Sequence, residues 1–149
     1  MTHAALTLPS RAEITTRILT EARRAPYAFG VNDCFFMGLR QIDAIQGTAH
    51  AEEHKSVYST LSGAQRALRR RGHKSLVTYY ATLLRPIGWG SARIGDLAIV
   101  EIDGAEHVGM ASHTCLLCQL RVALRACGCR LEAPMSGLRE RAFPADRSG

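Results

Sequence analysis

Residues 95–111 read GDLAIVEIDGAEHVGMA, and this stretch decides the fold class. Its run Leu97–Val100 is apolar and follows a glycine, which is typical of a β-strand. The pair Asp103-Gly104 is a strong signal for a tight hairpin turn, and a second apolar stretch follows it. We therefore expect two antiparallel strands, over residues 95–102 and 106–111. Further short strands are expected around residues 115–124 and 129–133.

The sequence before this hairpin has a helical period instead. After Cys34, apolar residues recur at three- and four-residue spacing until Gly47, a typical residue at the end of a helix. The segments Ser10–Glu13 and Ser62–Gln65 match the capping-box pattern that opens a helix. The expected helices run from Ser10 to just before Pro26, from Cys34 to Gly47, from Ser62 to Gly72 and from Ser75 to just before Pro86, with a polar loop over residues 48–60. Helices followed by an antiparallel sheet indicate the α+β class.

Length and composition predict one soluble, folded domain. The chain has 149 residues, of which 46% are hydrophobic and 21% charged, so disorder over the full length is excluded. We expect a flexible arm over residues 1–9, a single domain over residues 10–143 and a flexible tail over residues 144–149. No stretch approaches the ~20 apolar residues of a membrane span, so no membrane partner is expected. The first residues do not resemble a secretory signal, which predicts cytoplasmic synthesis.

The positive charge is concentrated in one segment. Nineteen Lys and Arg residues against thirteen Asp and Glu give a net charge of +6. The basic run consists of Arg66, Arg69, Arg70, Arg71, His73 and Lys74. A solvated helix end explains this run better than a surface for polyanions, because basic side chains favour the negative pole of a helix. Few aromatic residues accompany the run, so nucleic acid is not an expected partner.

Cys34 is set apart from the other cysteines of the chain. Of the five cysteines, Cys115, Cys118, Cys127 and Cys129 lie near the C-terminus, and an odd number cannot all pair. Cys34 is expected at a helix N-terminus, where the thiolate form of a cysteine is stabilised. His107, just after the hairpin turn, is the candidate base for such a nucleophile. Taken alone, each residue has a structural alternative: Cys34 as a small buried side chain and His107 as a hydrogen-bonded strand residue.

A resemblance joins these two residues. The segment Pro26–Gly30, followed by Asp33-Cys34 at the start of a helix, resembles the nucleophile segment of the NlpC-type cell-wall cysteine peptidases. The segment Gly95–Val100 resembles the glycine-aspartate-leucine strand of that family, and His107–Met110 resembles its histidine strand. The motifs come in the family's order over about residues 10 to 112. The resemblance implies a papain-like fold, with helices packed on an antiparallel sheet.

The resemblance also implies roles for single residues. Cys34 takes the place of the nucleophile and His107 that of the base. Gln119 lies where the family has a third polar residue that orients the histidine, and His113 is the other candidate for this role. Tyr27 resembles a tyrosine near the reactive sulfur, whose hydroxyl can help to hold an oxyanion. Asp33 matches an aspartate that meets the amino end of the peptide stem.

The implied activity is that of a thiol protease. By resemblance, the protein is a cysteine hydrolase of the peptide stems of peptidoglycan, in other words a cell-wall hydrolase that needs no cofactor. Phe29–Cys34, Tyr58 and Arg141–Phe143 look like a compact variant found among bacteriophage and prophage tail genes. The alternative is therefore a structural subunit of a tail tip, with other tail proteins as partners and the virion as its location. The family's usual Ser-Gly after the cysteine is replaced here by Phe35-Phe36, a pair that we expect in the core.

Two other patterns suggest metal binding, and both are weaker. His50–His54 fits the H-x-x-E-H signature of zinc peptidases, but it lies in the expected loop without an apolar face. Cys115, Cys118, Cys127 and Cys129 provide four thiols, with His113 as a substitute ligand. The pairs stand closer together than in typical zinc ribbons. We therefore expect no metal site.

Overall fold

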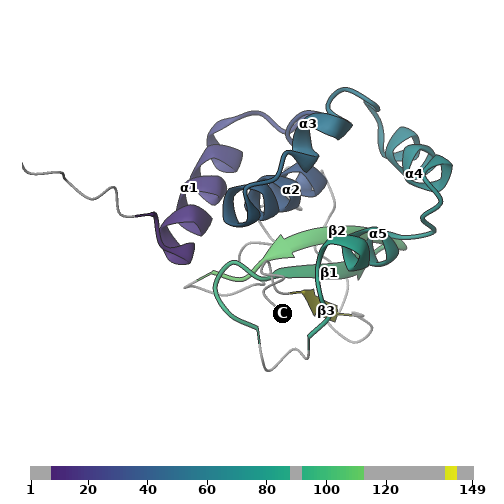
Figure 1. Cartoon of the computed structure of the whole chain (residues 1–149). Coiled ribbons are helices and arrows are strands. Elements are labelled where there is room, and N and C mark those ends of the chain that lie inside the picture. Colours follow the sequence, from purple (N-terminus) through teal and green to yellow (C-terminus); the bar gives the residue numbers. More distant parts are fainter. Residues whose placement is uncertain (1–7, 88–91, 113–139, 144–149) are drawn as a thin grey trace, which may run out of the picture.

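The computed structural model describes residues 8–87, 92–112 and 140–143 of the chain. Five helices and three strands are described: α1 (Arg11–Arg24), α2 (Cys34–Gln46), α3 (His50–His54), α4 (Leu61–Arg70), α5 (Leu76–Leu83), β1 (Leu97–Ile102), β2 (Ala105–Met110) and β3 (Glu140–Phe143). The helices come first in the chain and the sheet follows, which confirms the predicted α+β class (Figure 1). Within the described ranges, none of the helices is both long and apolar enough to cross a membrane.

The first two helices begin and end where local signals predict. Ser10 caps α1, and its side chain and that of Glu13 satisfy each other's backbone amides in a capping box. Asp33 caps α2 by accepting a hydrogen bond from the backbone of Phe36. Gly47 ends α2 in the left-handed conformation at φ 67°. The predicted boundaries of both helices are therefore confirmed to within a residue or two.

The segment between α2 and α5 differs from the prediction. The expected loop over 48–60 contains α3, a five-residue helix that holds both histidines of the H-x-x-E-H pattern. Asp43 starts this helix by accepting hydrogen bonds from the backbone amides of His50 and Ala51. The next helix, α4, begins two residues earlier than predicted, because Thr60 rather than Ser62 caps it through the amide of Gly63.

The sheet has the predicted hairpin at its centre. In the described part of the chain, three antiparallel strands are ordered β2-β1-β3. Asp103 (φ 51°) and Gly104 (φ 75°) form the tight turn between β1 and β2. Strand β3, which the sequence did not predict, pairs with β1 from the other side. The strands expected at 115–124 and 129–133, and most of the two expected flexible ends, lie outside the described residues.

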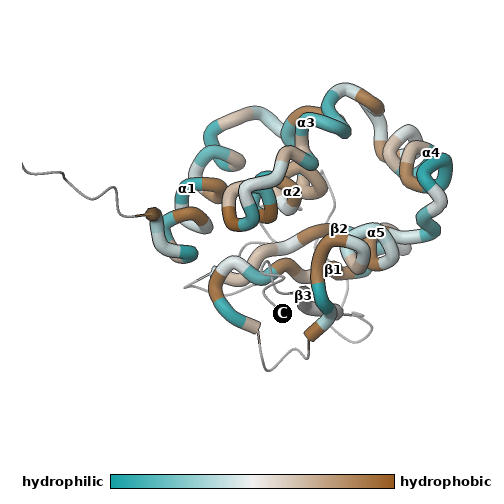
Figure 2. Tube along the Cα trace, viewed as in Figure 1, coloured by the Kyte–Doolittle hydropathy of each residue, from teal (hydrophilic) through white to brown (hydrophobic). Residues whose placement is uncertain are grey.

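Helix α2 packs on one face of the sheet at β2, and α1 packs against α2 (Figure 1). Alternation along β2 turns Glu106, Val108 and Met110 to this face. Val108 lies so close to α2 that a Cβ atom on Gly38 would be 3.0 Å from its Cγ1 atom. Glu106 accepts a hydrogen bond from the amide of Leu76 at the start of α5. Figure 2 shows apolar segments of α1, α2 and the strands turned toward this shared interior.

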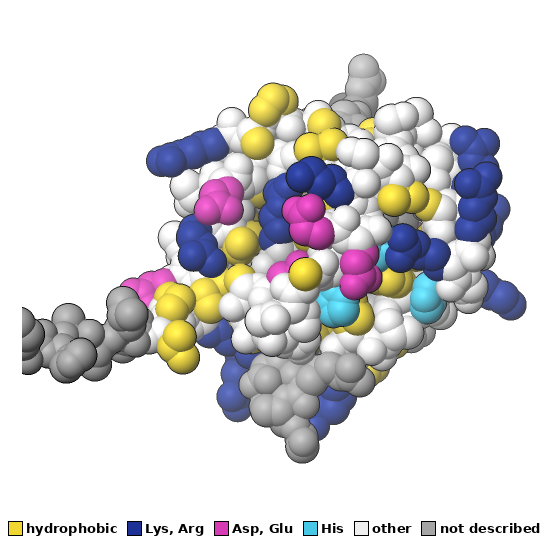
Figure 3. All heavy atoms as spheres, turned by 45° about the horizontal axis from the view of Figure 1, so that its top comes forward, with side chains coloured by type: hydrophobic (Ala, Val, Ile, Leu, Met, Phe, Trp, Pro, Cys, Tyr) yellow, Lys and Arg dark blue, Asp and Glu magenta, His cyan; other side chains and the backbone are white. Residues whose placement is uncertain are grey.

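The core joins these helices to the sheet. Its largest fully buried side chains include Tyr80, Phe36, Leu39, Ile42, Leu97 and Met110. Phe35 and Phe36 are both buried, which confirms that the aromatic pair after Cys34 belongs to the core. Helix α4 is different, because none of its residues is buried. In the space-filling view, Lys and Arg side chains gather on the side of the molecule where α4 lies (Figure 3).

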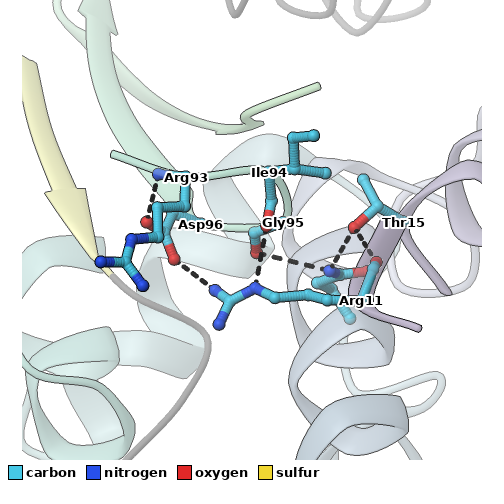
Figure 4. Close-up of polar contacts among 7 residues, drawn as sticks. Arg11, Thr15, Arg93, Ile94, Gly95 and Asp96 are labelled. Carbon is cyan, nitrogen blue, oxygen red and sulfur yellow. Dashed lines mark hydrogen bonds and ion pairs between the residues drawn. The ribbon is translucent and has the colours of Figure 1, made fainter. Parts of the chain in front are cut away.

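A polar junction fastens α1 and α2 to the start of β1 (Figure 4). Arg11 forms an ion pair with buried Asp96 and donates a second hydrogen bond to the carbonyl of Ile94. Gln41 donates to the hydroxyl of Thr15 over 2.9 Å. Gly95 is in the left-handed region at φ +85°, and a Cβ atom there would lie 2.6 Å from the Gln41 amide. The glycine of the Gly-Asp motif is therefore required both by its backbone angle and by the lack of space around it.

Candidate functional site

Cys34 is the first residue of α2 and follows a tight turn over residues 28–33. Ala28 and Asn32 form an isolated antiparallel bridge, and Gly30 between them adopts φ 81°. The Asn32 side chain donates to the carbonyls of Ala25 and Pro26, which ties the turn to the end of α1. The turn is thus fixed from both sides. Cys34 itself is half-buried at the edge of the core and is not in a disulfide.

Asp33 holds this turn together and is buried. Its Oδ1 atom accepts from the amide of Phe36 at 3.0 Å. Its Oδ2 atom accepts from the amide of Gly30 at 2.9 Å and from the hydroxyl of Tyr58 at 2.7 Å. Both oxygens of the carboxylate next to Cys34 are therefore engaged inside the protein. The role in substrate binding that the resemblance implied for Asp33 stays a prediction.

Tyr58 connects the turn to the segment after α3. Ser56 donates its backbone amide to the carbonyl of Gly30 at 2.9 Å. The backbone of Tyr58 lies so close to Gly30 that a Cβ atom there would be 1.9 Å from the Tyr58 carbonyl oxygen. Burial, together with the negative charge of Asp33, raises the pKa of Tyr58 far above its ordinary value. The phenol therefore remains a hydrogen-bond donor at any physiological pH.

Cys34 lines a pocket of about 360 Å³ between α4, α5 and the end of the hairpin. This volume lies in the range of small-molecule and peptide subsites. Near Cys34 the wall contains Tyr27, Phe29, Asp33, Phe35 and His54. The helix α4 and the residues after it contribute Leu61, Ala64, Gln65, Ala67, Leu68, Arg69, Arg71 and Lys74, and the hairpin contributes Glu101, Gly104, Ala105, Glu106 and His107. Three of the predicted site residues, Tyr27, Asp33 and His107, thus share one pocket with Cys34.

His107 lies on β2 and is buried. Its Nε2 atom has no hydrogen-bond partner in the part of the chain that the structure describes. In the strand register, His107 stands opposite Val100 and alternates with Val108, whose side chain meets α2. The imidazole therefore belongs to the pleat opposite to the one that faces α2. The structure brings His107 and Cys34 to the lining of one pocket.

A second histidine lines the same pocket. His54 is buried, and its Nε2 atom lies 2.8 Å from the hydroxyl of Tyr79. Its ring meets that of Phe35 edge to face, with the centroids 5.2 Å apart. Burial and the guanidinium of Arg71 lower the pKa of His54, so the neutral ring dominates at neutral pH. The sequence pattern around His54 suggested only the role of a zinc ligand. The fold around Phe35 is what brings it to the pocket.

The remaining predicted site residues and metal ligands fall mostly in the part of the chain that the structure does not describe. Gln119 and His113, the candidates for orienting the base, lie outside the described residues, as do Cys115, Cys118, Cys127 and Cys129. Within the described ranges, no three His, Cys, Asp or Glu side chains are grouped closely enough to hold a metal ion. His50 and His54 share α3, yet His54 is turned into the core against Tyr79.

Comparison with known families covers this same region. Residues 8–129 match the model of a family described as a domain of unknown function, DUF6950. The chain belongs to the DUF6950 family. The match includes the turn before Cys34, all five helices and the β1–β2 hairpin of the DUF6950 fold described above. No curated protein and no solved structure matches the chain.

Proposed function

We propose that this DUF6950 protein is a cysteine hydrolase with Cys34 as its nucleophile and a papain-like, NlpC-type fold. The observation that carries the proposal is the position of Cys34. It is the first residue of a thirteen-residue helix, and it lines a pocket large enough for a peptide segment. Free backbone amides and the helix dipole favour a thiolate at such a position. The three hydrogen bonds that Asp33 accepts hold the turn before Cys34 in place.

The proposed reaction is acyl transfer. The Cys34 sulfur attacks a peptide carbonyl carbon, forming a C–S bond while the C–N bond breaks. A histidine accepts the thiol proton and passes it to the leaving amine. Water then attacks the thioester, releasing the carboxylic acid and returning the proton to the sulfur. The resemblance to cell-wall peptidases supports the peptide stem of peptidoglycan as the substrate.

His107 is the proposed base. It lines the pocket, its Nε2 atom is buried without a partner among the described residues, and the resemblance assigns it this role. His54 is the second histidine to test as the base, since it is a neutral imidazole that lines the same pocket.

The test is turnover of purified peptidoglycan, read as new amino groups and as released peptides by mass spectrometry. The wild-type chain should release peptides, and Cys34→Ser should release none. His107→Ala should abolish release, whereas His54→Gln should retain most of it. Loss of release in His54→Gln alone would move the role of base to His54. A folded wild-type protein that releases nothing would favour the alternative, a structural subunit of a phage tail tip.

The reactivity of the Cys34 thiol can be measured independently of peptide hydrolysis. Limiting iodoacetamide near neutral pH should label Cys34 before Cys115, Cys118, Cys127 or Cys129, because Cys34 is at a helix N-terminus, where the thiolate is stabilised. His107→Ala should slow this labelling by removing the imidazolium partner of the thiolate. Faster labelling of another cysteine, as mapped by mass spectrometry, would remove Cys34 from the role of nucleophile.

A further inference from the structure

The helix α4 forms a wall of the Cys34 pocket and buries no residue of its own. Its pocket-lining residues include the apolar side chains Leu61, Ala64, Ala67 and Leu68. Leu61 is 44% exposed, although such a side chain gains free energy when it is covered. One side of α4 is therefore apolar and faces open space in the pocket, where an occupant would cover it.

The pocket divides the basic run of the sequence into two groups. Arg69, Arg71 and Lys74 line the pocket, whereas Arg66 and Arg70 do not. Arg66 and Arg70 are four positions apart and share a face of α4, whereas Arg71 and Lys74 follow the end of the helix. Figure 3 shows the basic side chains on this side of the molecule. Arg69 and Arg70 are exposed in the last turn of α4, as expected for a solvated helix end, and Arg69 and Lys74 also line the pocket.

Some charged side chains of the pocket already have hydrogen-bond partners within the protein. Arg71 donates to the backbone carbonyl of Glu53 and contacts the ring of His54. Glu106 accepts from the amide of Leu76 at 2.6 Å, and Asp33 is held by its own donors. Among the described residues, neither Arg69 nor Lys74 is in a salt bridge. The basic wall thus has cations available to a ligand, while exposed Glu101 marks the acidic, hairpin side of the pocket.

We propose that the wall formed by Leu61, Leu68, Arg69 and Lys74 selects a peptide that carries a carboxylate beside an apolar side chain. The apolar side chain would cover the two leucines, and the carboxylate would pair with Arg69 or Lys74. This inference rests on the proposed function for the identity of the pocket as a peptide site. It adds the charge and polarity of the peptide, which the position of Cys34 does not determine.

The first test compares two reagents of nearly equal size at Cys34. Iodoacetate is anionic and iodoacetamide is neutral, so the ratio of their alkylation rates at low salt reports the electrostatic potential at the thiol. The variant Arg69→Glu/Lys74→Glu should lower this ratio about three-fold or more. The matched control Arg66→Glu/Arg70→Glu changes the net charge equally on the same side of the molecule, and it should leave the ratio nearly unchanged. An equal fall in both variants, or no fall in either, would overturn the proposal.

This comparison needs only an accessible thiol, so it remains informative when no hydrolysis occurs. A failed hydrolysis assay with a selective fall in the ratio would reject the proposed function and retain the basic pocket wall. Circular dichroism should show the same fold in both double variants, because all four side chains are exposed. If a charge reversal unfolds the chain, Arg69→Gln/Lys74→Gln provides the milder comparison.

The second test uses the peptides N-acetyl-Leu-Glu-amide and N-acetyl-Leu-Gln-amide, which differ in one charge. The first peptide should protect Cys34 from iodoacetamide at lower concentration than the second. Arg69→Glu/Lys74→Glu should remove this difference, and Arg66→Glu/Arg70→Glu should keep it. Equal protection by both peptides in the wild-type chain, or protection by neither, would contradict the proposed selection.

Discussion

Tyr58 donates a hydrogen bond from its hydroxyl group to Oδ2 of Asp33 over 2.7 Å, across 25 positions of the sequence. Asp33 is the residue before Cys34, so a full negative charge at this carboxylate opposes a thiolate. Its three hydrogen-bond donors spread that charge, and the donor from Tyr58 is the one that comes from a distant segment. The contact therefore joins the stability of the turn to the ionisation of Cys34.

Tyr58→Phe should raise the pKa of the Cys34 thiol, because Asp33 loses one donor and its charge is less well dispersed. The rate of iodoacetamide labelling measured against pH gives this value directly. We also expect a loss of about 1–3 kcal/mol in the free energy of unfolding, since a buried carboxylate is left partly unsatisfied. The control is Tyr79→Phe, which removes a buried phenol that is hydrogen-bonded to His54 instead. An unchanged pH profile in Tyr58→Phe would show that the contact is structural only.

Arg11→Ala should lower the free energy of unfolding by about 1–3 kcal/mol, because buried Asp96 loses its ion-pair partner while Arg11 itself is partly exposed. Asp96 is 3% exposed and still accepts a hydrogen bond from the amide of Arg93 in the variant. Arg17→Ala is the matched control, because Arg17 lies on the same helix and is exposed. Urea unfolding followed by circular dichroism measures both variants. Equal stability of the two would mean that the junction at Asp96 contributes little.

Gly95→Ala and Gly104→Ala together separate backbone strain from crowding. Both glycines have positive φ, 85° and 75°, so each substitution carries about 1–2 kcal/mol of backbone strain. A Cβ atom at Gly104 meets nothing within 4 Å, whereas one at Gly95 would lie 2.6 Å from Gln41 and 2.7 Å from Thr15. Gly95→Ala should therefore cost about 1–3 kcal/mol more in unfolding free energy than Gly104→Ala. A smaller difference would mean that the side chains around Gly95 move aside readily.

His54 should make the fold sensitive to acid. Its pKa is lower in the folded chain than the ordinary value of 6.5, so the unfolded chain binds a proton more readily. The contribution of the neutral His54 ring to the free energy of unfolding is complete above pH 6.5, and it is lost as the pH falls toward the lowered pKa of the folded chain. Glu53, His50 and Arg71 act on this ring, which makes His50→Gln the control. In His54→Gln, the urea midpoint of unfolding should change less between pH 8 and pH 5 than in the wild-type chain. An unchanged pH dependence would show that His54 does not cause the loss of stability in acid.

Local signals in the sequence predicted the elements that depend on local contacts. The caps of α1 and α2 and the turn at Asp103-Gly104 involve residues within a few positions of one another, so their chemistry is readable directly. Strand β3 was missed, because its partner β1 lies some forty positions earlier and only tertiary pairing defines it. Thr60 was missed as a cap because Ser62, two residues later, offers the same chemistry.

The candidate site was predictable in its residues and less so in its geometry. The position of Cys34 follows from the cap at Asp33, and the pocket then collects Tyr27 and His107 as expected. Alternation along β2 is visible in the sequence, but the pleat that faces α2 is decided by the packing of Val108 on Gly38. The contribution of α4 was likewise hidden, because an amphipathic helix does not reveal in its sequence what its apolar side faces.

The junction of Figure 4 also has a consequence for how the chain acquires its structure. Arg11 and Asp96 lie 85 positions apart, and Gln41 reaches the carbonyl of Gly95 across 54 positions. These contacts can form only after the hairpin has left the ribosome. During most of synthesis, Arg11 on α1 and Gln41 on α2 therefore lack the contacts with Gly95 and Asp96. Closing so long a loop before any of these contacts is gained slows folding. A fragment that stops before Gly95 therefore lacks the residues that join α1 and α2 to β1. The helices should reach their native packing together with β1 in one cooperative step.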